Sequence, residues 1–301
     1  MKDSYPSISL VRFCRLLGIT RQALYQHGWR CEELNIEAEL IIQQVIEIRK
    51  RHPIIGTRKL YLMLQPFLLE HRIKIGRDKL FDLLAVYKLL VRKRRRKIST
   101  TQSYHRFHKY PNLIREMKIT GINQLWASDI TYYKLTKKFV YLSFVTDAYS
   151  HKIIGYHIAE SLETIHSLKA LQMAIDGSDL PTQNKIIHHS DRGIQYCSQE
   201  YVNLLENNHI LISMTENGDP LENPIAERVN AIIKDEYLNQ YHYSTIKELE
   251  EKLCQVVSFY NNERPHSSCS MFTPDKVHEQ NLPIKRKWKT YYRSKNPTTV
   301  P

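Results

Sequence analysis

The sequence is poor in cysteine and has neither a membrane-length apolar run nor an N-terminal leader pattern. Its five cysteines are Cys14, Cys31, Cys197, Cys254 and Cys269. They form no Cys-x-x-Cys pair and are odd in number, so we expect reduced thiols rather than a disulfide framework or a zinc site. No apolar run approaches the length of a membrane span, and residues 1–6 lack the character of a signal peptide. The expected location is therefore cytoplasmic, with no membrane partner.

Positive charge is what the chain has in excess. Its 301 residues carry a formal net charge of +13, which indicates a polyanionic partner, with nucleic acid ahead of a membrane surface. Residues 49–118 contain 20 Lys and Arg against four Asp and Glu. This local excess is larger than the net charge of the whole chain, so the basic character is concentrated in one region.

Two aspartates lie in or directly after predicted strands. Asp129 falls within residues 125–133, a β-branched and aromatic run that is typical of a strand. Asp191 follows the apolar run of residues 185–189 and precedes the turn signal Arg192-Gly193. Both carboxylates are therefore expected near strand positions that a sheet can bring together.

One glutamate lies at the start of a predicted helix. Asn223-Pro224 is typical of an N-cap followed by proline at the first helical position. Glu227 then falls in the first turn, where the helix dipole favours a carboxylate. Two strand-borne aspartates and this glutamate can converge on one point.

Such a group of carboxylates predicts a metal site. Like charges repel one another unless cations lie among them, and hard oxygen ligands favour Mg²⁺ or Mn²⁺. Two such ions can hold the attacking and leaving oxygens of a phosphodiester. The pattern therefore predicts phosphoryl transfer on DNA, although three acidic residues taken by composition alone are more often solvated surface groups.

Other polar residues near these positions have simpler predicted roles. Asp147 is expected to begin a turn, and Asp176-Gly177 to end a helix. His188 and His189 could contact the metals or shape the site, but a histidine at a strand end more often satisfies local hydrogen bonds, so a supporting role is favoured.

Several motifs occur in order along most of the chain. They are Trp126-Ala127-Ser128-Asp129-Ile130-Thr131, His189-Ser190-Asp191-Arg192-Gly193-Ile194-Gln195-Tyr196, Tyr260-Asn261-Asn262-Glu263-Arg264-Pro265-His266-Ser267 and Thr273-Pro274. Thirty-five residues separate Asp191 from Glu227, and Lys234 lies seven positions after Glu227 on the same helix face. With these motifs the chain resembles the DDE transposases of bacterial insertion sequences, of the second-reading-frame (OrfB) type that shares its catalytic core with retroviral integrases.

The resemblance implies an α/β catalytic core of the RNase H-like (retroviral integrase) fold, preceded by an all-α helix-turn-helix region. It implies a polynucleotidyl transferase that cuts the 3′ ends of an insertion sequence and joins them to target DNA. Asp129, Asp191 and Glu227 would be both the catalytic and the metal-binding residues. Asp129 would be shared by two Mg²⁺ (or Mn²⁺) ions, and the other two carboxylates would each complete one ion.

The resemblance also implies partners. They are the element's terminal inverted repeats, the target DNA, further copies of the chain in a DNA-assembled homo-oligomer, and an upstream-frame protein joined by frameshifting. The zinc module of retroviral integrases is expected to be absent. The location implied by these partners is cytoplasmic and nucleoid-associated.

The order of predicted elements fits the same core. Strands at residues 139–146 and 152–158 follow the strand of Asp129, and a helix is expected at residues 164–175. The later segments continue the alternation, which gives the order βββαβαβα of an RNase H-like fold.

The N-terminal region is predicted to be helical. Residues 7–27 form two short helices joined by a turn at Gly18, with Thr20 capping the second. In a helix-turn-helix, Arg21 and Gln22 would face a DNA groove, although by pattern alone a generic helical hairpin fits equally well. Further helices are expected at residues 36–50, 57–69 and 77–91.

The sharpest charge cluster is a run of six basic residues. It consists of Arg92, Lys93, Arg94, Arg95, Arg96 and Lys97. Because such a run repels itself without a polyanion, we predict that residues 92–118 form a linker that follows the DNA backbone and binds less tightly as salt rises. The alternative is a solvated charge run. The other predicted DNA contacts are Arg58, Lys59, Arg77, Arg192 and Lys234.

Five segments are therefore expected. They are an N-terminal helix-turn-helix at 1–34, a second helical DNA-binding module at 35–97, a basic linker at 98–120, the catalytic core at 121–278 and a basic tail at 279–301. Two alternatives to a transposase remain, a DNA-binding regulator with an inactive core and an RNase H-type nuclease without strand transfer.

Overall fold

The computed structural model of the chain describes residues 9–91, 108–136, 138–178, 185–216 and 222–284. The chain divides into two compact units. Unit 1 comprises Met1–Lys50 and Gly56–Arg92, and unit 2 comprises Arg51–Ile55 and Lys93–Pro301. The predicted basic run at residues 92–97 and the basic tail from residue 285 onward lie outside the described residues.

Unit 1 begins with two helices joined by a short turn. α1 spans Leu10–Leu16 and α2 spans Arg21–Arg51. Gly18 in the turn has φ +67°, a conformation that glycine adopts without a steric cost. The Thr20 hydroxyl accepts a hydrogen bond from Ala23 N at 3.0 Å, so the predicted glycine turn and threonine cap are confirmed.

α2 is longer than the sequence predicts. The helix expected to start after Thr20 and the helix expected at residues 36–50 are one continuous helix. Residues 21–51 contain no proline, and the single Gly28 costs only about 1 kcal/mol, which does not end a helix. The expected segment boundary between residues 34 and 35 therefore falls inside α2.

Two further helices complete unit 1. α3 spans Thr57–Glu70 and α4 spans Arg77–Val86. Their buried leucines recur at four-residue spacing and so lie on one face of each helix; they are Leu60, Leu64 and Leu68 in α3 and Leu80 and Leu84 in α4. α4 ends before the predicted residue 91, because Lys88 has φ +56° and Leu89 N bonds back to Leu84 O at 2.7 Å.

Unit 2 is built on a five-stranded sheet. Its strands are β1 (Leu125–Lys134), β2 (Phe139–Asp147), β3 (Ile153–Ala159), β4 (Ile187–Ser190) and β5 (Leu211–Met214). Their order across the sheet is β3-β2-β1-β4-β5. β1, β2 and β3 are antiparallel neighbours, whereas β4 is parallel to both β1 and β5.

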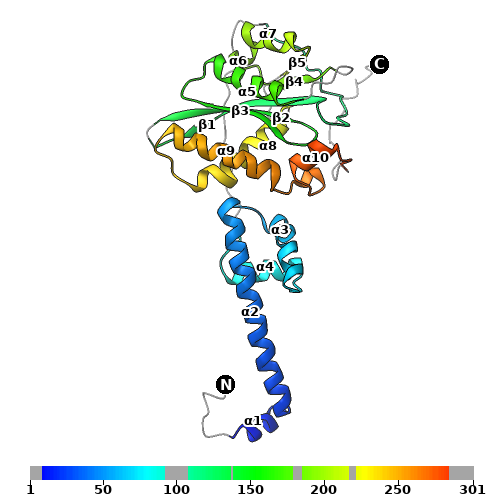
Figure 1. Cartoon of the computed structure of the whole chain (residues 1–301), viewed down its shortest axis with the longest axis vertical. Coiled ribbons are helices and arrows are strands. Elements are labelled where there is room, and N and C mark those ends of the chain that lie inside the picture. Colours follow the sequence, from blue (N-terminus) through cyan, green and yellow to red (C-terminus); the bar gives the residue numbers. More distant parts are fainter. Residues whose placement is uncertain (1–8, 92–107, 137, 179–184, 217–221, 285–301) are drawn as a thin grey trace, which may run out of the picture. The chain divides into compact units, whose positions relative to one another are not determined.

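Helices cover both faces of this sheet (Figure 1). On one face lie α5 (Thr164–Asp176), α6 (Ile194–Cys197) and α7 (Gln199–Asn207). On the other lie α8 (Pro224–Ile232), α9 (Ile246–Asn262) and α10 (Pro274–Gln280). A π-helical turn, Ile233–Tyr237, extends α8 directly. This order of elements is that of the RNase H-like fold, so the predicted fold class is confirmed.

Apolar side chains that alternate along the strands contribute to two separate hydrophobic cores, one on each face of the sheet. Val140, Leu142 and Phe144 of β2 pack with residues of α8 and α9, whereas Val145 packs with residues of α5 and α7. Successive strand residues point to opposite faces, which explains why neighbouring positions enter different cores. Within the described ranges, no helix is both long and apolar enough to span a bilayer.

The turn between β2 and β3 is held by a buried carboxylate. Asp147 Oδ1 accepts hydrogen bonds from Ser150 N and Ser150 Oγ, each at 2.7 Å, and its Oδ2 accepts one from Asn123 N at 2.8 Å. The predicted role of Asp147 in a turn is therefore confirmed, and the side chain is fully engaged in it.

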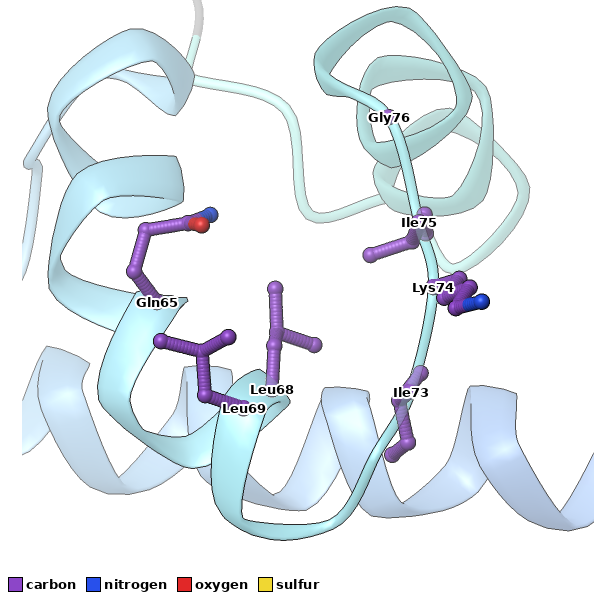
Figure 2. A pocket seen from close by; sticks show the side chains of 7 residues that line it. All are labelled: Gln65, Leu68, Leu69, Ile73, Lys74, Ile75 and Gly76. Atoms are coloured by element: carbon purple, nitrogen blue, oxygen red, sulfur yellow. The ribbon is translucent and has the colours of Figure 1, made fainter.

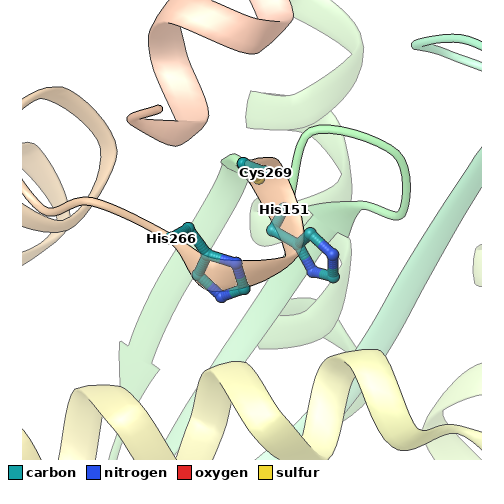
Figure 3. Close-up of side chains that lie close together, drawn as sticks. All are labelled: His151, His266 and Cys269. Atoms are coloured by element: carbon teal, nitrogen blue, oxygen red, sulfur yellow. The ribbon is translucent and has the colours of Figure 1, made fainter. Parts of the chain in front are cut away.

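The C-terminal motif packs against the same turn. Asn261 accepts a hydrogen bond from Ile153 N at 3.0 Å and donates one to Ile153 O at 2.9 Å, as another strand would. Figure 3 shows His151, His266 and Cys269 side by side, with potential ligand atoms within 4.8 Å of one another. Stacking of the two imidazole rings at 4.5 Å holds these residues together. Burial raises the pKa of Cys269 to about 12, and its Sγ donates a hydrogen bond to Ser150 O at 3.1 Å.

Replacing Gly155 with Ala is expected to destabilise unit 2. An added Cβ would lie 2.1 Å from the Ala170 carbonyl oxygen of α5, so helix and sheet would have to separate. Overpacking of this kind costs about 1–3 kcal/mol or more. Urea unfolding of Gly155→Ala should therefore show a lower midpoint, whereas Gly76→Ala, where the new Cβ meets nothing within 4 Å, should not. Equal midpoints for the two variants would contradict this packing.

Candidate active site

Strand register brings the two candidate aspartates together. β1 and β4 pair in parallel, with Trp126 opposite His188 and Ala127 opposite His189. Continuing that register by two residues places Asp129 opposite Asp191, which lies just beyond the end of β4. Neighbouring strands are about 4.8 Å apart, so the two side chains leave the same face of the sheet as neighbours.

One face of α8 faces β1 and carries the candidate glutamate. Asn223 donates from Nδ2 to Ser128 O at 2.8 Å, and Asn230 donates from Nδ2 to Asp129 Oδ2 at 2.7 Å. Glu227 lies between them at helical spacing, four residues after Asn223 and three before Asn230. The two amides thus fix the part of α8 that presents Glu227 toward Asp129.

The electrostatics of the site show that the three carboxylates are close. Burial, followed by the charges of Asp191 and Glu227, raises the pKa of Asp129 to about 8. Hydrogen bonds from Ile130 N and from Asn230 oppose this shift but do not cancel it. Burial and two neighbouring like charges together favour the protonated carboxyl, and a cation bound among the three oxygens would favour the charged form instead.

Two neutral histidines support the ends of the strands. His188 Nε2 lies 2.7 Å from Ser128 Oγ and 3.0 Å from Tyr201 OH, within hydrogen-bonding distance of both hydroxyls. His189 Nε2 lies 3.1 Å from the Glu222 carbonyl oxygen, at the start of α8. Burial is the main cause that lowers the pKa of His188 to about 3 and of His189 to about 4. Both rings are therefore uncharged and held by local hydrogen bonds, the arrangement that the sequence analysis favours for a histidine at a strand end.

Lys234 reaches from the π-helical turn to the strand that carries Asp129. Its Nζ donates to Thr131 Oγ1 at 2.7 Å and lies 3.4 Å from Tyr132 O. Burial lowers the pKa of Lys234, while the charges of Asp235 and Asp129 raise it. The ammonium group is therefore within electrostatic reach of the carboxylate cluster.

The predicted DNA contacts in unit 1 lie at the starts of helices. Arg21 and Gln22 are the first two residues of α2 and are exposed. Arg58 is exposed in the first turn of α3, Lys59 beside it is half-buried, and Arg77 is exposed at the start of α4. These positions leave the side chains accessible, and their DNA-binding role stays a prediction.

Of the remaining predicted DNA contacts, Arg192 lies within the described residues and the run from Arg92 to Lys97 does not. Arg192 directly follows Asp191 and is half-buried, and its role also stays a prediction. The predicted contacts from Arg92 to Lys97 lie outside the described residues. The structure therefore bears on only part of the predicted DNA-binding surface.

Unit 1 also has a shallow hollow beside α3. Figure 2 shows its lining, which comes from the second half of α3 and the segment before α4. The lining residues are Gln65, Leu68, Leu69, Ile73, Lys74, Ile75 and Gly76. They are mainly aliphatic and include none of the predicted DNA contacts, so this hollow is separate from the predicted interface.

The sequence prediction missed the two asparagines that hold α8. Asn223 was expected to cap the helix with its side chain, but that side chain bonds to β1 and makes no cap hydrogen bond. Asn230 lies inside a helix, where asparagine is unfavourable, and it is only 5% exposed. A buried helical asparagine on the same face as Glu227 is the signal that could have indicated its role.

Replacing Asn230 with Ala is expected to weaken metal-dependent activity. Asp129 would lose the donor that orients it, and loss of such a supporting hydrogen bond commonly costs about 10–100-fold in metal affinity or activity. The Mg²⁺ concentration that gives half-maximal DNA cutting should therefore rise. Asn239→Ala is the matched control, because Asn239 makes a similar bond to Asp235 Oδ1 at 3.0 Å on an exposed surface. An unchanged Mg²⁺ requirement in Asn230→Ala would contradict the assignment.

Family models and known proteins match this chain over the region just described. Models of the integrase core domain match residues 120–220 and 208–274. The IS600 insertion element uncharacterized 31 kDa protein of Shigella sonnei is 30% identical over 271 residues, which cover 89% of this chain and 97% of that protein. The transposase for insertion sequence element IS629 of Shigella sonnei is 30% identical over 223 residues, 74% of this chain and 72% of that protein.

A solved structure is similar to part of unit 2. The HTLV-2 integrase catalytic core domain in complex with magnesium is 22% identical, with a TM-score of 0.42, over 52% of this chain and 96% of that chain. The sequence relatives carry the family assignment, because their similarity extends over most of both chains. This chain therefore belongs to the transposases of bacterial insertion sequences, as its motifs predict.

Proposed function

We propose that this transposase cuts DNA at the 3′ ends of its insertion sequence and joins the freed 3′ ends to target DNA in a metal-dependent reaction. The observation that supports this most is the mutual influence of Asp129, Asp191 and Glu227, which helps raise the pKa of Asp129 to about 8. Transposases of this family are polynucleotidyl transferases. The reaction is then phosphoryl transfer from one DNA strand to water and to another strand.

The donor set suits a hard divalent cation. All three side chains offer carboxylate oxygens, the ligands that Mg²⁺ and Mn²⁺ prefer. We propose two ions, with Asp129 as the shared ligand and Asp191 and Glu227 each completing one ion. Bound ions of this kind stabilise the attacking and leaving oxygens of a phosphodiester.

The chain's own groups orient the ligands and the substrate. Asn230 holds the Asp129 carboxylate, and Asn223 holds the start of the helix that presents Glu227. Lys234, kept beside β1 by Thr131, is positioned to bind a DNA phosphate through a charge-assisted hydrogen bond. The nucleophile is a hydroxyl of water or of a DNA 3′ end, so no covalent bond to the protein is required.

We further propose how the rest of the chain contributes. Residues 1–97, in which α2 crosses the expected boundary at residue 34, bind the terminal inverted repeats. Residues 98–120 follow the DNA backbone, and residues 121–278 carry out the chemistry. Both ends of the element must be held at once, which favours a homo-oligomer assembled on DNA, with an upstream-frame protein as a further partner. Nucleoid association follows from DNA binding of this kind.

A strand-transfer assay tests the proposal. The substrate is a pre-cleaved duplex that carries the element's terminal repeat, incubated with target DNA and Mg²⁺. Joined products support a transposase, cutting without joining supports an RNase H-type nuclease, and binding without either supports a DNA-binding regulator. Glu227→Gln should abolish cutting and joining but leave DNA binding intact.

Glu200→Gln is the matched control for that variant. Glu200 is also an exposed acidic residue in the first turn of a helix, α7, but α7 lies on the face of the sheet opposite to α8. It should therefore be dispensable. If Glu227→Gln recombined DNA at the wild-type rate, Glu227 would not be a catalytic residue.

A further inference from the structure

A cluster of imidazole and thiol groups lies where the C-terminal motif meets the turn between β2 and β3. His151 comes from that turn, and His266 and Cys269 come from the segment that follows α9 (Figure 3). His266 is 4% exposed and Cys269 is 0% exposed, whereas His151 is half-buried. Each of the three side chains offers one ligand atom, and these atoms lie within 4.8 Å of one another. The cluster includes none of the three carboxylates of the candidate active site.

The spacing of these ligand atoms is close to that of a zinc site. Zn–N distances of about 2.0–2.1 Å and a Zn–S distance of about 2.3 Å, at tetrahedral angles, place the ligand atoms of one ion about 3.4–3.6 Å apart. Atoms that already lie within 4.8 Å of one another reach this separation through shifts of about 1 Å. The planes of the two stacked imidazole rings are 20° apart, so their edges lie side by side, and rotation of each side chain can turn one nitrogen toward the same ion.

The donor set selects the class of metal. Two imidazole nitrogens and one thiolate are ligands of Zn²⁺ and of softer cations, whereas Mg²⁺ prefers oxygen. The charge of the buried Asp147, after burial itself, raises the pKa of the Cys269 thiol, and the same negative charge favours a cation beside the sulfur. A thiol that binds zinc is deprotonated. The ion would therefore replace the proton that Cys269 donates to Ser150 O, and that proton would pass to solvent.

We infer that His151, His266 and Cys269 bind a zinc ion that fixes the C-terminal motif to the turn between β2 and β3. His151 and His266 are 115 positions apart in the sequence, so the ion would cross-link two distant segments, and its binding free energy would stabilise the fold. Water completes the tetrahedral coordination, because the half-buried His151 leaves one side of the cluster accessible. The spacing of the cysteines does not indicate this site, because it uses a single cysteine and two histidines.

Co²⁺ is the spectroscopic probe that tests this inference, because a thiolate bound to Co²⁺ gives a charge-transfer band in the near ultraviolet. The full chain is freed of metal, kept reduced and titrated with Co²⁺ in the absence of DNA. The band should appear and saturate, Zn²⁺ should remove it, and excess Mg²⁺ should not. Zn²⁺ should also raise the melting temperature of the metal-free protein, since it binds the folded state.

Two variants remove one ligand each and keep the local hydrogen bonds. In Cys269→Ser, the hydroxyl can donate to Ser150 O as Sγ does at 3.1 Å. In His266→Asn, the amide oxygen can accept the bond that Ser268 N donates to His266 Nδ1 at 3.3 Å. Both variants should therefore fold, which far-ultraviolet circular dichroism checks, and should bind Zn²⁺ about 100-fold or more weakly. Cys269→Ser should also lose the Co²⁺ band.

Cys254→Ser is the matched control. Cys254 is an exposed free cysteine and does not belong to the cluster. This variant should keep the Co²⁺ band and the wild-type affinity for Zn²⁺.

Three results would overturn the inference. The first is a wild-type protein that gives no thiolate band with Co²⁺, and the second is a band that persists in Cys269→Ser. The third is an unchanged affinity for Zn²⁺ in His266→Asn. None of these measurements needs DNA or catalysis, so they test the zinc site separately from the proposed function.

Discussion

Replacing Asp129 with Asn is expected to abolish DNA cutting and joining while it stabilises the metal-free protein. Loss of the metal ligand proposed above would remove several kcal/mol of transition-state stabilisation, which at 1.36 kcal/mol per tenfold is about 10³-fold or more in rate. In the absence of metal, the same change removes one of three mutually repelling carboxylates. Thermal unfolding in EDTA should therefore occur at a higher temperature, by about 2–4 °C for each kcal/mol gained.

The stability gain should depend on pH. The pKa of Asp129 is about 8 in the folded protein, against an ordinary value of 3.8. Between about pH 4 and about pH 8, the folded protein therefore holds a proton on Asp129 that the unfolded chain has released. The metal-free wild type therefore becomes less stable as pH rises from about 4 to about 8. Asp129→Asn does not titrate, so its advantage should be small at pH 5 and largest above pH 8. An advantage that shrinks as pH rises would contradict this electrostatic account.

Asp147→Asn is the control that should behave in the opposite way. Burial alone would raise the pKa of Asp147, but hydrogen bonds from His278 and Ser150 outweigh burial and lower it. An amide cannot accept all three of the hydrogen bonds from Asn123 and Ser150 that this carboxylate accepts. The variant should lose about 2–4 kcal/mol. In the wild type, this contribution is present above the unfolded pKa and is lost as pH falls through the folded pKa.

Replacing Glu236 with Ala is expected to cause the largest loss of stability in the core. Arg264 has a side chain that is 0% exposed, and it donates to Glu236 from Nε and Nη2, each at 2.8 Å. Removing the carboxylate leaves the guanidinium buried without that ion pair, which costs about 3–5 kcal/mol. The melting temperature should fall by about 6–20 °C. Because Glu236 belongs to the π-helical turn that carries Lys234, DNA binding near the site should weaken as well.

A double variant distinguishes the cost of leaving a buried charge unpaired from the cost of lost packing. Glu236→Met combined with Arg264→Met removes both charges and keeps most of the volume, so it should be more stable than Glu236→Ala. If the double variant were the less stable of the two, the cost would lie in packing rather than in an uncompensated buried charge. Urea unfolding of the single and double variants measures the difference.

The sequence predicts the local elements well because their signals are local. Alternating apolar and aromatic residues placed the strand of Asp129, and Asn223-Pro224 placed the start of the helix that carries Glu227. The predicted ends of two helices in unit 1 were wrong, because nothing in the local sequence marks where these helices end. A single Gly28 did not interrupt α2, and Lys88 ended α4 in a left-handed conformation that no local pattern announces.

From the sequence alone, the class of this protein followed from its motifs: their resemblance to a known family predicted an RNase H-like transposase and assigned its three carboxylates to Asp129, Asp191 and Glu227. Only the tertiary structure decided which groups surround them. The β1–β4 register places Asp129 opposite the position of Asp191, and contacts across the chain bring Asn230 to Asp129 and Lys234 to the Tyr132 ring. The spacing of apolar residues along the sequence predicts which face of its own helix or strand a residue occupies. The contacts of Asn230 and Lys234 join residues about 100 positions apart. They depend on how α8 packs against the sheet, and no single segment of the sequence specifies that packing.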